Sequence, residues 1–116
     1  MSERDIILLL QDILDSAEKI RKYVDGCDYQ DFLDDDKTID AVVRNFEVIG
    51  EAGNRIDPDF RNSNPEIEWN RIRGLRNRLV HDYFGIDYEI VWSIIQNDLD
   101  YLISGIRLLI QNNTGG

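Results

Sequence analysis

Residues 3–25, ERDIILLLQDILDSAEKIRKYVD, carry a regular apolar pattern that predicts a long amphipathic helix. Apolar side chains recur every three or four positions, at Ile6, Leu9, Leu10, Ile13, Leu14, Ala17, Ile20 and Val24. That spacing places them on one face of an α-helix. Ser2 followed by Asp5 resembles a capping box at the start of this helix, and Gly26 suits its end.

Three later segments show the same periodicity and predict helices over about residues 37–56, 64–84 and 87–111. Asp57-Pro58 ends the second helix, because the residue before proline disfavours helical backbone. Asn64-Pro65 suits the start of the third helix as a cap followed by proline. Gly50 and Gly53 lie within one turn of the second helix. They indicate either close approach of another backbone or simple tolerance of two weak helix formers.

Four helices with short connections predict an all-α fold, an antiparallel four-helix bundle. We see no strand pattern and no internal repeat. The connector over residues 29–36 has room for a short extra helix. A chain of 116 residues predicts a single domain over residues 1–116, with residues 111–116 as a frayed tail.

The composition narrows the classes of function. The net charge is −10, which disfavours non-specific binding to a nucleic-acid backbone but allows a local anion site. The single cysteine, Cys27, can form neither an internal disulfide nor a zinc site, so we expect a reducing, cytoplasmic compartment. We find no secretion signal and no apolar run long enough to span a bilayer, so we expect no membrane partner.

One segment opposes the acidic charge of the chain. Residues 69–81 contain four arginines and no carboxylate, so they carry +4 while the remainder sums to −14. Arginine forks suit phosphate oxygens, which makes Arg71, Arg73 and Arg78 candidates for binding phosphate. The alternative is structural, since helical arginines are commonly solvated and Glu66 or Glu68 could neutralise their neighbours.

The only histidine, His81, closes this basic segment. On a continuous helix His81 shares a face with Asn77 and lies about 140° away from Arg76. Histidine titrates near neutral pH and suits acid–base catalysis, but a lone histidine more often has an ordinary structural role. By itself, His81 therefore does not establish a catalytic site.

The run Arg76-Asn77-(three residues)-His81-Asp82-Tyr83 resembles the Arg-x4-His-x-Tyr signature of HEPN-domain ribonucleases, specifically the HepT toxin family. The resemblance extends over most of the chain, because residues 49–52, Trp69 and residues 91–92 are also similar to that family. It implies a HEPN-like helical bundle.

The resemblance also implies a function. It implies the toxin of a type VII-like toxin–antitoxin system, a metal-independent endoribonuclease in the prokaryotic cytoplasm. Arg76 and His81 would be catalytic, Asn77 would support them, and neither a metal nor a cofactor would be required. The partner would be a minimal nucleotidyltransferase antitoxin of the MntA type, which silences the toxin by attaching AMP to Tyr83.

Cleavage of RNA by its own 2′-hydroxyl needs a base, an acid and a cation for the developing charge. One chain supplies one histidine, so we expect a two-fold homodimer that brings two copies of His81 and Arg76 into one cleft. The third helix should then lie at the interface.

Two other classes of function stay open from the residues alone. The chain could be a non-catalytic helical module that presents a substrate or nucleotide to a nucleotidyltransferase. It could also be a structural helical dimer whose arginines have no ligand.

Overall fold

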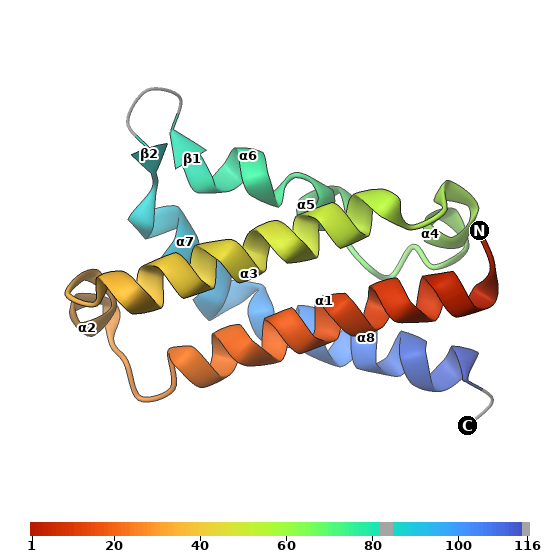
Figure 1. The fold of residues 1–116 in the computed structure, drawn as a ribbon, viewed down its shortest axis with the longest axis horizontal. Coiled ribbons are helices and arrows are strands. Elements are labelled where there is room, and N and C mark those ends of the chain that lie inside the picture. The colour runs from red at the N-terminus through yellow and green to blue at the C-terminus, as the bar shows by residue number, and fades with distance from the viewer. Residues whose placement is uncertain (82–84, 115–116) are drawn as a thin grey trace.

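The computed structural model describes residues 1–81 and 85–114, and these residues form a helical bundle with one very short hairpin (Figure 1). The long helices are α1 (Glu3–Tyr23), α3 (Asp36–Arg55), α7 (Tyr88–Asn97) and α8 (Leu99–Asn113). The short elements are α2 (Tyr29–Leu33), α4 (Pro58–Ser63), α5 (Trp69–Arg73), α6 (Leu75–Leu79), β1 (Val80–His81) and β2 (Gly85–Ile86). The predicted all-α, HEPN-like bundle is confirmed, although two of its four expected helices are broken.

Helix α1 has the predicted cap at its start. The Asp5 N–H donates to the Ser2 hydroxyl at 3.1 Å, and the Ser2 N–H donates to the Asp5 carboxylate at 3.2 Å. After the helix, Gly26 has a φ of +76°, a conformation that glycine adopts without strain. The sequence therefore placed both ends of this helix correctly to within two residues.

The connector after α1 contains the expected short helix, α2. Its Phe32 is fully buried and packs against Trp92 of α7, with ring centroids 5.3 Å apart. Asp35 then caps α3 by accepting from the Thr38 N–H at 3.1 Å and from the Thr38 hydroxyl at 2.7 Å. These hydrogen bonds lower the pKa of the Asp35 carboxyl, that from the hydroxyl most and that from the N–H next.

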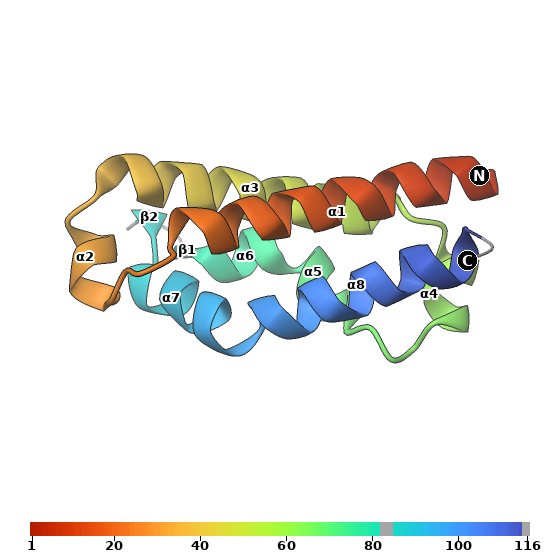
Figure 2. The same cartoon turned by 90° about the horizontal axis from the view of Figure 1, so that it is seen from below.

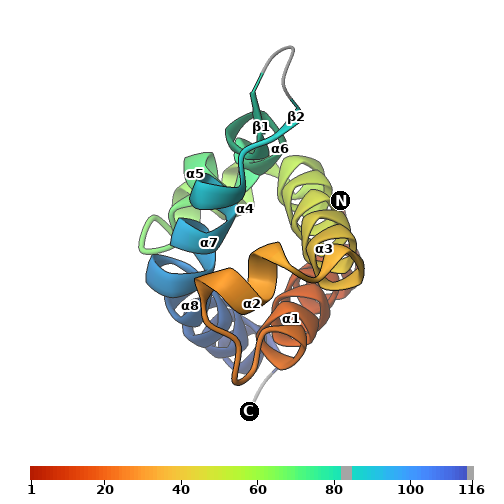
Figure 3. The same cartoon turned by 90° about the vertical axis from the view of Figure 1, so that its left-hand side faces the viewer.

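The bundle has four legs: α1 is the first, α3 the second, α5 with α6 the third, and α7 with α8 the fourth. These four legs enclose one core. Helix α1 packs against α3 and α8, and α3 packs against α5 and α6. The end-on view in Figure 3 shows these legs in a ring, with α2 across the near end. Side chains from every leg are fully buried, including Leu10, Ile13, Ile20, Phe46, Ile49, Leu79, Ile95, Leu99 and Ile106.

The fourth leg consists of two helices, so the prediction of a single helix over residues 87–111 is wrong. Asp87 caps α7 by accepting from the Ile90 N–H at 3.1 Å, so the fourth helical segment begins where the sequence predicted. The helix then ends at Asn97, Asp98 has a φ of −110°, and α8 runs on to Asn113. Figure 2 shows α7 and α8 meeting at an angle along one side of the molecule. The apolar stripe continues through the bend, so periodicity alone did not reveal it.

Helix α8 extends two residues beyond the predicted helix end. The Asn113 amide donates to the Leu109 carbonyl at 2.8 Å, and the Thr114 hydroxyl donates to the Ile110 carbonyl at 2.8 Å. These hydrogen bonds satisfy the last turn. Residues 115 and 116 of the predicted frayed tail lie outside the described part of the chain.

Candidate functional site

The third leg carries the sequence-predicted site, and it is not the single helix expected over residues 64–84. It comprises α5 and α6, which are separated at Gly74, and it begins at Trp69 rather than at Asn64-Pro65. Pro65 lies in an irregular segment after α4. There the Asn64 carbonyl accepts from the Trp69 indole N–H at 2.9 Å. This contact anchors the entrance to α5.

Two glycines of α3 let this leg approach closely. A Cβ on Gly50 would lie 3.3 Å from the Ile72 carbonyl oxygen, and a Cβ on Gly53 would lie 2.6 Å from the Ile72 Cγ2. The second distance is shorter than real Cβ contacts allow. Of the two explanations left open by the sequence, close approach of another backbone is confirmed at Gly50, whereas Gly53 makes room for the Ile72 side chain.

The third leg ends as an antiparallel hairpin, which corrects the predicted helix end at Phe84. Val80 is extended, with φ −118° and ψ 128°. Val80 pairs with Ile86 and His81 pairs with Gly85, whose φ is +79°. The Asp87 N–H also donates to the Leu79 carbonyl at 2.8 Å. The hairpin exchanges helical hydrogen bonds for cross-strand ones, and the glycine supplies a backbone conformation that other residues adopt with strain.

The hairpin changes the expected relation between the candidate catalytic residues. Asn77 lies on α6, whereas the His81 backbone lies in β1, so the two do not share a helical face. Arg76 and Asn77 are both exposed, one turn or less before the hairpin. Tyr83 lies outside the described residues. It therefore stays a prediction that one site contains Arg76, Asn77 and His81.

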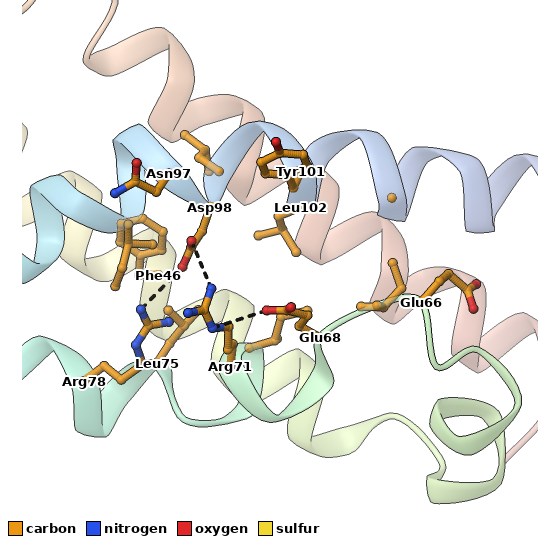
Figure 4. Close-up of a pocket in the computed structure, with 15 residues that line it drawn as sticks. Phe46, Glu66, Glu68, Arg71, Leu75, Arg78, Asn97, Asp98, Tyr101 and Leu102 are labelled. Carbon is orange, nitrogen blue, oxygen red and sulfur yellow. Dashed lines mark hydrogen bonds and ion pairs between the residues drawn. The ribbon is translucent and has the colours of Figure 1, made fainter.

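The four arginines of the third leg fall into two groups. Arg71 and Arg78 both reach Asp98 at the α7–α8 bend, at 3.2 and 3.4 Å, and Arg71 also pairs with Glu68 at 3.2 Å (Figure 4). The sequence anticipated Glu68 as a partner for Arg71. It missed Asp98, which is 27 residues from Arg71 and 20 from Arg78.

Arg73 and Arg76 have no carboxylate partner among residues 1–81 and 85–114. The Arg73 guanidinium donates to the neutral Asn54 side chain at 2.9 Å. The pKa of the Arg61 guanidinium is lowered, mainly because Arg61 is desolvated and secondly because the positive charge of Arg73 is nearby. Arginine stays protonated at neutral pH despite such shifts. The uncompensated positive charge of this leg therefore resides on Arg73 and Arg76.

A cavity of about 450 Å³ lies between the third and fourth legs (Figure 4). Arg71, Arg78 and Asp98 line it, but Arg76 and Asn77 do not. Its other lining residues are Phe46, Glu66, Ile67, Glu68, Ile72, Leu75, Ile94, Asn97, Leu99, Tyr101, Leu102 and Gly105. The cavity is thus separate from the exposed surface that carries Arg76.

The described ranges contain neither a metal-binding cluster nor a membrane-spanning helix. No group of three or more His, Cys, Asp or Glu side chains within residues 1–81 and 85–114 could hold a metal ion. No helix in the same ranges is long and apolar enough to cross a membrane.

Comparison with known proteins gives consistent matches. Residues 13–109 match the family described as "Ribonuclease HepT-like". The chain is 42% identical over 109 residues to a protein of Methanocaldococcus jannaschii named "putative RNase", with 94% of this chain and all of the relative covered. A second protein of that organism with the same description is 38% identical over 115 residues, or 99% of this chain and 95% of the relative.

A relative from Thermococcus cleftensis, named "probable ribonuclease HepT", is 39% identical over 93 residues. The alignment covers 80% of this chain and 84% of the relative. No solved structure matches the chain significantly.

Proposed function

Because the chain belongs to the HepT-like ribonuclease family, we propose that it is an endoribonuclease whose active site contains Arg76 and His81. One observation supports the proposal most directly. Arg76 is an exposed arginine without a carboxylate partner in the described ranges, and it lies on the last turns before the hairpin that carries His81. Such a cation is available to a phosphate, whereas Arg71 and Arg78 are already paired.

In the proposed reaction the RNA 2′-hydroxyl attacks its own phosphate. The hydroxyl loses a proton to a base as the new P–O bond forms, and the 5′-oxygen gains a proton from an acid as the old bond breaks. Histidine suits both roles near neutral pH, and arginine stabilises the phosphorane-like charge without titrating. No water is activated, so we expect cleavage without a metal ion.

We place this reaction in a homodimer. A single His81 cannot act as base and acid at the same time, so two copies from a two-fold dimer would share the roles. Asn77, exposed next to Arg76, would orient a phosphate or a histidine by hydrogen bonding.

We further propose regulation at Tyr83, which lies outside the described residues. The chain would be a toxin of the prokaryotic cytoplasm, held inactive by a minimal nucleotidyltransferase of the MntA type that transfers AMP to the Tyr83 hydroxyl. The added phosphate would compete with RNA for Arg76, and the added base would obstruct the RNA path.

Inducible expression of wild type, His81→Ala and Arg76→Ala tests the nuclease. Wild type should arrest growth and cleave cellular RNA, each variant should do neither, and the purified enzyme should stay active in a chelator. Arg107→Ala is a matched control, because Arg107 is an arginine of α8 that pairs with Glu18 of α1 at 3.0 Å, away from the third leg. Full cleavage by His81→Ala would contradict the proposal. Tight binding to a nucleotidyltransferase without RNA cleavage would instead favour the non-catalytic binding module.

Mass spectrometry tests the regulation separately. Incubation with the nucleotidyltransferase and ATP should add about one AMP mass per modified site, and Tyr83→Phe should prevent it. Tyr101→Phe is the matched control, because Tyr101 is 82% exposed on α8 and should leave the modification unchanged. Modification that persists in Tyr83→Phe would place the target elsewhere.

A further inference from the structure

The bend at Asp98 is held by side chains from two other legs of the bundle. On one side, the Asp98 carboxylate binds Arg71 of α5 and Arg78 of α6 (Figure 4). On the other side, Arg21 of α1 binds Asp100 at 2.6 Å and donates to the Ile95 carbonyl at 3.4 Å. Residues 97–99 contain neither glycine nor proline. The bend is therefore fixed by tertiary contacts rather than by a residue that breaks helices.

Asp98 connects both halves of the broken third leg to one point. Arg71 precedes the break at Gly74 and Arg78 follows it. The Asp98 side chain is 25% exposed and that of Arg78 is 33% exposed, so this pair is shielded better than an ordinary surface ion pair. A single carboxylate thus fixes α5 and α6 relative to each other and to α7.

The hairpin that carries His81 extends from the ends of α6 and α7, and two contacts join these helices (Figure 1). Next to the hairpin, the Asp87 N–H at the start of α7 donates to the carbonyl of Leu79, the last residue of α6. At the far end of α7, Asp98 binds Arg78, the neighbour of Leu79. The ion pair and the hydrogen bond together set how α6 sits on α7. Arg76 lies on α6, whose last residue leads directly into the hairpin.

We propose that Asp98 is a positioning residue for the site that contains Arg76 and His81. This inference rests on the proposed ribonuclease function. Asp98 holds Arg78 and Arg71 toward the cavity side of the third leg and orients α6, which carries Arg76. It does not touch the substrate.

A different role for Asp98, neutralising Arg71 and Arg78 without positioning the site, would change KM rather than kcat when Asp98 is substituted. If Asp98 only masks two cations, its loss frees Arg71 and Arg78 for RNA, so KM falls and kcat stays the same. If Asp98 positions the site, its loss disturbs the geometry of the reacting groups. Small misplacements of such groups lower kcat by roughly 10- to 100-fold.

The test compares Asp98→Asn, Asp98→Glu and wild type on a fluorogenic single-stranded RNA of mixed sequence. Asp98→Asn should lower kcat by roughly 10- to 100-fold with KM within about twofold of wild type. Asp98→Glu keeps the carboxylate and should recover much of the loss. Glu18→Gln is the matched control, because it removes one carboxylate from an ion pair, with Arg107 of α8, that does not involve the bend. It should leave kcat near wild type.

A second set of variants keeps the test decisive if Asp98→Asn folds poorly. Arg71→Gln with Arg78→Gln should reproduce its kinetic defect, and adding Asp98→Asn to that pair should lower kcat no further. Such non-additivity is expected for residues that act through one contact. An unchanged kcat in Asp98→Asn, or a lower KM with unchanged kcat, would overturn the inference.

Hydrogen exchange provides a readout that does not depend on catalysis. Asp98→Asn should speed exchange of the Asp87 and Arg78 amides, which donate to Leu79 and Gly74, while amides at the α1–α3 contact keep their protection. If wild type cleaves no RNA, the proposed function fails. If wild type cleaves RNA but neither kcat nor these amides respond to Asp98→Asn, only the positioning role fails.

Discussion

At the scale of single residues, charge compensation separates the arginines of the third leg. Arg71 and Arg78 share the Asp98 carboxylate, and Arg71 also binds Glu68. Arg73 binds only a neutral amide, and Arg76 has no polar partner in the described part of the chain. A phosphate gains most from a cation whose charge is not already neutralised. We therefore rank Arg76 and Arg73 above Arg71 and Arg78 as RNA contacts.

This ranking predicts the salt dependence of RNA binding. In a His81→Ala background, Arg76→Gln and Arg73→Gln should each reduce the slope of log Kd against log salt concentration by about 0.7. Arg71→Gln should change the slope by much less, because Arg71 already has two carboxylate partners. Fluorescence anisotropy with single-stranded RNA measures the slopes. Equal reductions for all three variants would show that Asp98 and Glu68 release Arg71 to the RNA.

Asp35 predicts a specific response to acid. The Thr38 hydroxyl and N–H lower the pKa of the Asp35 carboxyl, so its ionised form stabilises the folded state. This stabilisation is complete above the unfolded-state pKa, near 4, and is lost as pH falls through the lower folded-state pKa. Asp35→Asn keeps a capping oxygen but has no charge. The difference in unfolding free energy between wild type and Asp35→Asn should therefore shrink between pH ~7 and pH ~3 in urea denaturation.

The matched control for Asp35 is Asp12→Asn, since Asp12 is exposed on α1 and its side chain makes no hydrogen bond or ion pair in the described ranges. It should show little dependence on pH relative to wild type. A gap between wild type and Asp35→Asn that is the same at both pH values would contradict the role of the charge.

At the scale of elements, the close packing of α3 against α5 depends on Gly53. Alanine there gains about 0.5–1 kcal/mol from helix propensity. Its Cβ, however, would meet the Ile72 Cγ2 at 2.6 Å, and Ile72 is buried. Overpacking of this kind destabilises by about 1–3 kcal/mol. Gly53→Ala should therefore lower the free energy of unfolding by about 1–2 kcal/mol in urea denaturation.

Gly105→Ala is an informative control for Gly53→Ala. Its Cβ would also meet an isoleucine, Ile67, at 2.7 Å, but at the terminal Cδ1. Ile67 lies in an irregular segment, and its terminal methyl can rotate away. We expect a change within about 0.5 kcal/mol. Similar destabilisation by both substitutions would show that the cost does not depend on whether the new Cβ meets the Cγ2 or the terminal Cδ1 of an isoleucine.

The sequence predicted α1 and α3 well because their caps and breakers are local. Ser2, Asp35 and Pro58 act on backbone within three residues of themselves. The breaks in the other two legs have distant causes. Gly74 allows a break, but α3 packs against the leg on either side of it. Asp98 bends the fourth leg while bound to arginines 20 and 27 residues away.

The hairpin was missed because its strands are two residues long, too short for an alternating pattern to register. Gly85 follows directly after the predicted helix over residues 64–84, where a glycine suits a helix end as well as a hairpin. The candidate site shows the same division between local and distant causes. Exposure of Arg76 and Asn77 followed from their place outside the apolar stripe. The acidic partner of Arg71 and Arg78 lies on another leg, although Asn97-Asp98 would have suited a helix start.

At the scale of the whole molecule, the charge distribution fits a localised RNA contact. The chain carries −10 in total, so its surface as a whole repels a nucleic-acid backbone. Pairing with Asp98 leaves Arg73 and Arg76 as the uncompensated cations of the third leg, and Arg76 lies on the helix that leads into the hairpin with the only histidine. A protein with this net negative charge should bind RNA weakly outside its active site. Affinity would then come from the assembled cleft rather than from a broad basic face.

The expected dimer predicts how activity depends on subunit mixing. If two copies of His81 act together, a mixed dimer of wild type and His81→Ala is inactive. Equal amounts, after free exchange of subunits, leave about one quarter of dimers fully wild type. Activity should therefore fall to about one quarter of that of the same total number of wild-type chains, instead of about one half. Mixing with Arg107→Ala, which should keep full activity, controls for the exchange procedure. A fall to one half would mean that each chain cleaves RNA with its own histidine, and the acid or the base would then have to be another group.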